Sequence, residues 1–273
     1  MDAPHGLAGS EGVDPALLAR IEDASLNASA PPQQRWLDGW LVRFSPGKAR
    51  RARSIQAVAP GRLPVDAKLA LAAEVYREAA LPMQVRVTPF SAPEGLDAHL
   101  AALGWEAIED TRVMVCADLR AWSPPAGQPA RAQPAGLCWT ELDATAFAEA
   151  VGALRGSTPA ARVAHAERLR AAPVVFRAYA WTDAASGAVL ACGQYAREGA
   201  LVGLYDVFTA PACRRNGLAS SLCGRMLSIS ASEGAGIAYL QVDAANSVSQ
   251  SVYRRLGFAE GYSYHYRVPP PSS

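Results

Sequence analysis

Residues 137–267 alternate between runs of strand-forming residues and amphipathic segments, and this order leaves few folds open. We expect strands over 137–140, 174–182, 188–197, 201–209, 237–242 and 258–267. We expect helices over 141–154, 159–171, 217–233 and 246–256. The third helix carries Leu218, Leu222, Met226 and Ile229 on one face, at helical spacing. The order β-α-α-β-β-β-α-β-α-β predicts an α/β (α+β) fold, a mixed β-sheet flanked by helices.

The run 120–136 differs in composition from both of its flanks. It is rich in Pro, Ala and Gly, which cannot hold a strand ladder and which favour an extended backbone. We therefore interpret it as a linker. It divides the chain into a first domain over 13–119 and a second over 137–268.

Charge and apolar content exclude several classes of function. The 273 residues have a net charge of +1, so no overall field favours nucleic acid or an anionic membrane as partner. No apolar run approaches the ~18 residues of a membrane span. The N-terminal residues do not resemble a signal peptide.

The five cysteines are scattered, and their spacing matches neither a zinc site nor a disulfide framework. Unpaired cysteines fit a reducing compartment. We expect a cytoplasmic protein without a metal ion. The residues concerned are Cys116, Cys138, Cys192, Cys213 and Cys223.

The segment Arg214-Arg215-Asn216-Gly217-Leu218-Ala219 joins an expected strand to an expected helix. A turn of this kind presents backbone N–H groups at the positive end of the helix dipole, which is a cradle for phosphate. Gly217 lacks the Cβ that would block a pyrophosphate. An ordinary strand-to-helix turn would use the same glycine for its conformation alone, so the loop by itself leaves both interpretations open.

A second segment follows the next strand, and the two together resemble the GNAT superfamily of acyl-CoA-dependent N-acyltransferases. The phosphate loop of that family has the form Gln/Arg-x-x-Gly-x-Gly/Ala, matched here by Arg214, Gly217 and Ala219. Its later segment, Asn-(x)₆-Tyr followed by Gly-Phe, is matched by Asn246, Tyr253, Gly257 and Phe258. The resemblance covers residues 137–267, and it implies a GNAT-like fold with acetyl-CoA as cosubstrate.

The resemblance also implies where acetyl-CoA binds. The expected contacts come from the end of one strand, the loop and the later segment: Val207, Phe208, Thr209, Arg214, Arg215, Asn216, Gly217, Leu218, Ala219, Ser220, Asn246 and Tyr253.

Three of these positions have specific roles in the family. A backbone N–H near Val207 or Phe208, at a strand bulge, stabilises the oxyanion formed on attack. Asn246 contacts the pantetheine arm where strands 201–209 and 237–242 splay apart. Tyr253 protonates the departing thiolate. A neutral amine attacks the acetyl carbonyl directly, without a covalent enzyme intermediate.

The acceptor amine must lose a proton before it attacks, because a free alkyl ammonium titrates near pKa ~10. Asp206 is the first candidate for the base, as the only carboxylate in 201–209. A structural hydrogen bond is the alternative role for this side chain. Asp243, Gln241 and a chain of waters are rivals, and the family has no fixed base position.

Other polar residues have weaker claims on the site. Tyr264, His265 and Tyr266 could line an acceptor pocket from the last strand, although a strand histidine is more often simply hydrogen-bonded in place. His165, on an expected helix, has no specific claim. Two groups of arginines could meet anions or only face solvent: Arg225, Arg254 and Arg255, and the run Arg50, Arg51 and Arg53.

Residues 13–119 match the second half at one constant offset. Sliding the chain by the 153 positions between Leu103 and Leu256 places Leu103-Gly104-Trp105 on Leu256-Gly257-Phe258. The expected helix 65–80 and the expected strands 84–87 and 54–58 then fall on elements of the same type. We therefore expect a degenerate second copy of the fold, making two tandem copies, with chance agreement of patterns as the alternative.

The first copy has lost the residues of the cosubstrate site. The same offset places Gly61, Pro64, Pro93 and Leu100 on Arg214, Gly217, Asn246 and Tyr253. Proline has no N–H to offer a phosphate. We therefore expect the first half to bind no CoA and to help enclose the acceptor pocket of the second.

The sequence thus favours an N-acetyltransferase that acts on a primary amine of a small molecule or amino acid. A protein Lys or N-terminal acetyltransferase and a non-catalytic CoA-binding sensor are the alternatives. The expected partner is the small-molecule amine, with neither nucleic acid nor membrane, and a homodimer is left open.

Overall fold

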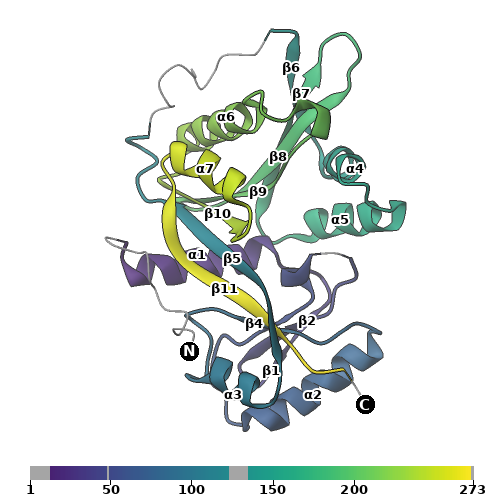
Figure 1. The fold of residues 1–273 in the computed structure, drawn as a ribbon, viewed down its shortest axis with the longest axis vertical. Coiled ribbons are helices and arrows are strands. Elements are labelled where there is room, and N and C mark those ends of the chain that lie inside the picture. The colour runs from purple at the N-terminus through teal and green to yellow at the C-terminus, as the bar shows by residue number, and fades with distance from the viewer. Residues whose placement is uncertain (1–12, 48, 123–134, 272–273) are drawn as a thin grey trace.

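A computed structural model describes residues 13–47, 49–122 and 135–271. Their strands form one sheet of 11 strands, in the order β1-β2-β3-β4-β11-β5-β10-β9-β8-β7-β6 (Figure 1). The two expected domains therefore share a continuous sheet. Residues 123–134 of the expected linker lie outside the described residues.

The first half contributes the elements α1 (Pro15–Ala28), β1 (Gln34–Leu37), β2 (Trp40–Arg43), the 3-10 turn η1 (Arg50–Ala52), β3 (Ile55–Gln56), α2 (Val65–Glu78), β4 (Val85–Val87), α3 (Leu96–Ala102) and β5 (Glu106–Cys116). The second half contributes β6 (Leu137–Leu142), α4 (Ala144–Leu154), α5 (Pro159–Ala171), β7 (Val175–Asp183), β8 (Val189–Glu198), β9 (Leu201–Thr209), η2 (Pro211–Cys213), α6 (Leu218–Ser232), β10 (Ile237–Asp243), α7 (Ser247–Arg255) and β11 (Ala259–Val268).

The mixed sheet flanked by helices is the predicted fold class, and each element expected in the second half is present. The boundaries of some elements differ from the expected ones by a few residues. The helix expected from 141 starts at Ala144, because Asp143 accepts a hydrogen bond from the Ala146 N–H and caps it. Residues 141 and 142 extend β6 instead.

The strand β5 was not expected from the sequence, and it is the element that unites the two halves. It pairs antiparallel with β10 on one side and with β11 on the other. β11, the last strand of the second half, pairs in turn with β4 of the first half. Each half thus inserts its final strand into the sheet of the other, and the two strands run side by side through the middle of the molecule (Figure 1).

The observed elements agree with the expected duplication. α2 and α6 begin at Val65 and Leu218, the same 153 positions apart as the Leu-Gly-aromatic segments. β5 and β11 begin at Glu106 and Ala259, again at that offset. The structure therefore extends the repeat to the strand that the sequence patterns had missed.

Helices cover both faces of the sheet. In the second half, α6 and α7 lie on one face and α4 and α5 on the other, while α1 crosses the middle of the molecule (Figure 1). Alternate strand residues divide accordingly, since Tyr179 and Trp181 join the core beneath α6 whereas Ala178 and Ala180 join the core beneath α4. No helix among the described residues is long and apolar enough to cross a membrane.

Part of the expected linker is packed against the second half. Trp122 lies against the core beneath α6, and its indole N–H donates to the Leu256 carbonyl at 2.7 Å. This contact closes the end of α7, where the unpaired carbonyls of a helix need donors. The start of the segment is therefore structural.

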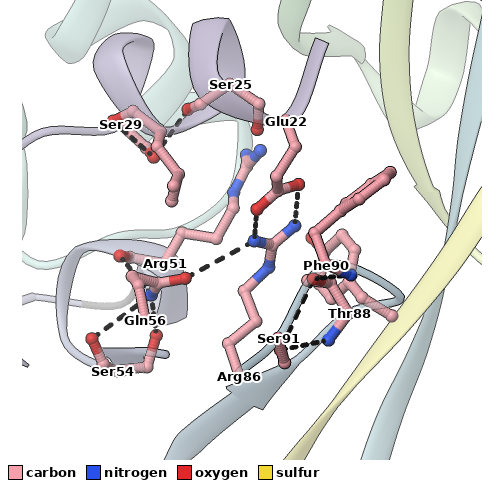
Figure 2. Close-up of polar contacts among 12 residues, drawn as sticks. Glu22, Ser25, Ser29, Arg51, Ser54, Gln56, Arg86, Thr88, Phe90 and Ser91 are labelled. Carbon is pink, nitrogen blue, oxygen red and sulfur yellow. Dashed lines mark hydrogen bonds and ion pairs between the residues drawn. The ribbon is translucent and has the colours of Figure 1, made fainter. Parts of the chain in front are cut away.

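A buried carboxylate on α1 contacts the two adjacent strands β4 and β11. Arg86 on β4 donates through both of its terminal nitrogens to the carboxylate of Glu22, as Figure 2 shows. The Tyr262 hydroxyl of β11 donates to the same carboxylate at 2.6 Å. Burial opposes ionisation of Glu22, but the charge and hydrogen bonds of Arg86 prevail, and the pKa of Glu22 lies below its ordinary value.

We predict that Glu22→Ala destabilises the protein by about 3–5 kcal/mol, because it leaves the Arg86 charge buried without its partner. Urea unfolding at neutral pH measures this. The contribution exists above the ordinary glutamate pKa of ~4.3 and is lost as the pH falls through the lowered folded pKa, so the difference from wild type should shrink in acid.

The matched control is Glu74→Ala, which removes an ion pair with Arg77 on the exposed side of α2 and should change stability little. Equal losses in the two variants would contradict the special role of the buried pair.

Candidate active site

Two neighbouring strands separate at the centre of the second half. β9 and β10 pair in parallel from Leu201 with Ile237 to Leu204 with Leu240. Beyond that point no pairing is recorded, although β9 continues to Thr209 and β10 to Asp243. The two strands therefore separate after Leu204 and Leu240, and a splay between them is what the family resemblance implied.

A β-bulge lies on β9 directly after this point. Against β8, Tyr205 pairs with Gln194 and Phe208 with Cys192, so Asp206 and Val207 together face the single residue Gly193. Asp206 has a φ of +51°, a left-handed conformation that is rare outside glycine. A bulge leaves an extra backbone group unpaired. The predicted donor near Val207 therefore has a structural basis.

Gly193 makes room for the bulge. A Cβ at this position would lie 3.2 Å from a methyl carbon of Val207 and 3.1 Å from the Met226 terminal methyl. Contacts of that length are tighter than ordinary packing, so the glycine fixes how closely β8, β9 and α6 approach one another.

The predicted phosphate loop forms an uncapped helix start. Gly217 is the N-cap residue of α6 with a φ of +74°, and no side chain caps the helix. Arg215 also has a positive φ, of +65°. The N–H groups of Leu218 and Ala219 make no hydrogen bond within the described part of the chain. Unpaired N–H groups at a helix start form an anion site, so the loop fits the diphosphate of a nucleotide cosubstrate.

The first arginine of the loop, Arg214, contacts the end of β9. The Arg214 guanidinium lies 5.6 Å from the ring centre of Phe208, and its Nε donates to the Thr209 carbonyl at 3.5 Å. Arg214 therefore bridges the end of β9 and the loop. Arg214 and Phe208 both belong to the predicted contact set for acetyl-CoA, and they lie side by side in the structure.

Asn246 is the N-cap of α7, where its side-chain oxygen accepts from the Ser249 N–H at 3.0 Å. This capping role was not expected. It orients the side chain and leaves the amide NH₂ as the group that could reach a pantetheine carbonyl. The predicted contact thus remains a prediction.

Tyr253 lies on α7 against the apolar core beneath α6. It shares that core with Val207 and Cys213, and its ring meets Phe258 edge-on with centroids 6.2 Å apart. Burial raises the pKa of the phenol well above its ordinary value, so the hydroxyl stays protonated. A protonated phenol can give its proton to a thiolate.

Asp206 lies on the opposite face of the sheet, beside α4 and α5. One carboxylate oxygen accepts from Arg155 at 2.8 Å and the other from the Gln194 amide at 2.9 Å. His165 Nε2 lies 3.4 Å from the second oxygen. Burial would raise the pKa of Asp206, but His165 and Arg155 outweigh it and hold the pKa far below its ordinary range.

The expected role of Asp206 as the base is therefore not supported. A carboxylate whose negative charge is stabilised this strongly is a weak proton acceptor. Its geometry fits the alternative named from the sequence, a hydrogen-bonded carboxylate. Here it holds the side chains of two helices beside the bulge.

Asp206 and His165 line a cavity of about 390 Å³ between the two halves. Tyr264 and Tyr266 of β11 line it, as the sequence suggested, together with Arg50 and Arg51 from η1. The first half therefore helps to enclose this cavity. The full lining is Gly47, Ala49, Arg50, Arg51, Glu109, Thr111, Arg155, Ser157, Ala161, His165, Arg168, Asp206, Tyr264 and Tyr266.

The other polar candidates are engaged elsewhere. His265 is buried and hydrogen-bonds Asp97 at 2.9 Å. Gln241 bonds Ser25 and Tyr264, and Asp243 accepts from the Ala245 N–H. The Arg225 guanidinium lies over the Trp139 and Trp181 rings. Neither Gln241 nor Asp243 is among the residues that line the cavity.

No role was expected for His165 or Arg168 from the sequence, although both line the cavity. His165 lies 41 positions before Asp206, on a helix whose pattern identifies no special face. The helix α5 packs against α4, which itself contacts β9, and His165 lies beside Asp206 in this arrangement. Among the described residues, no group of three or more His, Cys, Asp or Glu side chains could hold a metal ion.

In the first half, the loop before α2 corresponds to the phosphate loop, and an aspartate side chain occupies its N–H groups. The Asp38 carboxylate accepts from the N–H groups of Arg62 and Leu63, at distances from 2.7 to 2.9 Å. By the offset of 153, these two residues match Arg215 and Asn216. Pro64 follows as the N-cap of α2, where Gly217 precedes α6. An internal carboxylate thus occupies the N–H groups that a phosphate would need.

Several solved structures share the fold of this chain. A GCN5-related N-acetyltransferase from Kribbella flavida is 19% identical, with a TM-score of 0.59 and coverage of 93% of this chain and 96% of that one. A tandem GNAT protein from the clavulanic acid biosynthesis pathway is 18% identical, with a TM-score of 0.58 and coverage of 76% and 70%. No curated protein matches the chain.

A family model also matches almost the whole chain. It covers residues 17–267 and is described as "Probable histone acetyltransferase Rv0428c C-terminal". With the splayed strands, the bulge and the uncapped loop in place, the chain belongs to this acetyltransferase family and thus to the GNAT N-acetyltransferases.

Proposed function

We propose that the protein transfers an acetyl group from acetyl-CoA to the primary amine of a small molecule, by direct attack in a ternary complex. The observation that carries this proposal is the bulge at Asp206 and Val207. It lies beside the strand splay, with an uncapped anion cradle following it and a cavity of about 390 Å³ against it.

The cosubstrate would bind on the α6 and α7 side of the sheet. The N–H groups from Arg215 to Ser220 would hold the diphosphate, with Arg214 adding positive charge. The Asn246 amide would meet the pantetheine arm. Acetyl-CoA supplies the activated acyl group when bound, and the splay between β9 and β10 gives that group a route through the sheet.

The acceptor would bind in the cavity on the opposite face. His165 is the proton acceptor that the geometry supports, with Asp206 orienting its ring and stabilising the imidazolium. The separation of 3.4 Å is long for a hydrogen bond, and such catalytic contacts commonly tighten when substrate binds.

The reaction then balances as a simple exchange. The acceptor ammonium gives one proton to His165, which passes it to solvent, and the neutral nitrogen then forms a bond with the acetyl carbon. The bulge N–H near Val207 or Phe208 stabilises the oxyanion. As the carbon–sulfur bond breaks, the thiolate takes the proton of Tyr253. The second proton that the nitrogen loses, relayed by solvent, restores the Tyr253 phenol. The products are an amide, free CoA thiol and one proton.

A protein substrate is the second candidate, because the name of the matching family model refers to histones. The cavity lining does not favour this candidate. It holds four arginines against two carboxylates, and a positive cavity repels lysine-rich peptides. A screen of small amines and basic peptides with acetyl-CoA, following free thiol release, compares the two directly.

We predict that Gly217→Leu abolishes CoA binding while the fold remains, because a side chain would block close approach of the diphosphate to the loop. Calorimetric titration with CoA measures the affinity. Gly199→Leu is the matched control, since Gly199 has a φ of +58° in the β8–β9 turn and lies outside the loop. Undiminished affinity in Gly217→Leu would remove the cradle assignment.

We predict one CoA per chain, because Asp38 and Pro64 disable the equivalent loop of the first half. The stoichiometry from the same titration decides this. Two tight sites would show that the first half has kept a working cradle.

We predict that Tyr253→Phe lowers kcat by about 10²–10⁴-fold with little change in acetyl-CoA affinity, since the hydroxyl acts only as the thiolate leaves. Tyr76→Phe is the control, because it removes a buried hydroxyl bonded to the Arg43 carbonyl in the first half. An unaltered rate in single-turnover measurements of the chemical step would exclude Tyr253 as the acid.

A further inference from the structure

The cavity between the two halves contains more positive than negative charge. Its lining has the four guanidinium groups of Arg50, Arg51, Arg155 and Arg168, and the two carboxylates of Glu109 and Asp206. A net charge of +2 in a partly enclosed space is unfavourable unless an anion compensates it.

Two of the four arginines already have partners. The Arg50 Nε lies 2.6 Å from the Glu109 carboxylate, and its Nη1 donates to Gln84 at 2.7 Å. Arg155 donates to Asp206 and lies over the Phe208 ring. These two pairs account for both carboxylates of the lining.

Arg51 and Arg168 are the remaining two. Arg51 comes from η1 of the first half, and its buried Nη1 has no hydrogen-bond partner among the described residues. In Figure 2 its side chain extends from the loop toward α1, and no dashed line reaches its guanidinium. Arg168 comes from α5 of the second half and lines the same cavity.

Packing holds the Arg51 guanidinium in place, 5.7 Å from the centre of the ring of Tyr205, the residue that precedes the bulge. Arg168 lines the same cavity as Asp206. Burial lowers the pKa of Arg168, and the charge of Asp206 counteracts that effect. The buried Arg51 donor without a partner costs free energy, which points to a ligand that supplies one.

We propose that the acceptor amine carries a carboxylate or another anionic oxygen group, and that Arg51 and Arg168 bind this group together. The guanidinium fork matches the geometry of such oxygens. This inference rests on the proposed function and names the substrate class of the same site.

The cavity would then attract a positive group at one end and a negative group at the other, as an amino acid has. Its ammonium end is attracted to Asp206 and lies beside His165, which removes the proton. Its anionic end lies against the two arginines. A neutral amine would leave the buried Arg51 donor without a partner, and a diamine would place a second positive charge beside the two arginines. Because one arginine comes from each half, recognition would require both halves of the chain.

The test is a set of matched acceptors assayed with acetyl-CoA, following thiol release by the intact protein. Amino acids are compared with their primary amides, with their decarboxylated amines and with O-phosphoethanolamine. We expect kcat/KM for an anionic acceptor to exceed that for its neutral partner by at least about 10-fold, as for a charge-assisted hydrogen bond. The carboxylate and phosphate compounds distinguish the two sources of anionic oxygen.

Variants test whether Arg51 and Arg168 cause the preference for anionic acceptors. Arg168→Gln and Arg51→Gln should raise KM for anionic acceptors by about 10–100-fold, leave the acetyl-CoA Kd unchanged, and remove the preference of acid over amide. Arg168→Lys keeps the charge without the fork and should recover part of the loss. Arg170→Gln is the control, because Arg170 is on the same helix but outside this cavity and bonds Thr145.

The outcomes are distinguishable. A preference of the wild-type protein for neutral or cationic amines, with thiol release intact, would overturn the anionic acceptor and leave the proposed function standing. An acid preference that survives in both Gln variants would also overturn it. If acetyl-CoA binds and no amine or peptide releases thiol above the background, the proposed function itself fails.

Discussion

The antiparallel pairing of β5 with β11 is the constraint on which the rest of the structure depends. Each of these strands is the last of its own half, yet β5 completes the sheet beside β10 and β11 completes it beside β4. Neither half has a closed sheet without the other. The Glu22–Arg86 pair (Figure 2) reinforces this junction, since it joins α1 to β4. The Tyr262 hydroxyl joins the same carboxylate to β11. The position of η1 over the cavity follows from the same junction, and so does the presence of Arg51 beside a site that belongs mainly to the second half.

Duplication explains why the two halves have diverged in chemistry while keeping their geometry. The loop before α2 and the loop before α6 start helices at equivalent positions, but one is neutralised from within by Asp38 and the other is left open. A satisfied anion site contributes to stability, because the carboxylate caps backbone N–H groups. An open one leaves those groups unpaired until a ligand arrives. The first half has thus become the stable support, and the second has kept the unsatisfied groups that binding requires.

Sequence patterns predicted the local parts of this molecule well and the long-range parts poorly. The loop at Gly217, the splay after Leu204 and the bulge at Asp206 follow from short motifs and from the family resemblance. The strand β5 was missed, although the offset that matched Leu103 with Leu256 would have placed it on β11. The base role of Asp206 stays a prediction, and contacts far away in the sequence disfavour it: Arg155 and His165, from the α4 and α5 region, lower the pKa of this carboxyl. No motif in the sequence around His165 identifies it as a site residue.

The placement of β11 has a consequence for how the chain can be made. A nascent chain emerges from its N-terminus, and domains ordinarily fold in that order. Here the edge of β4 that pairs with β11 stays open until Ala259–Val268 has been synthesised. Until then the first half exposes an unpaired strand edge, the kind of surface that invites aggregation. Pairing of these two strands needs contacts between residues 178–182 positions apart, such as Val87 with His265, and contacts so distant in the sequence are slow to form.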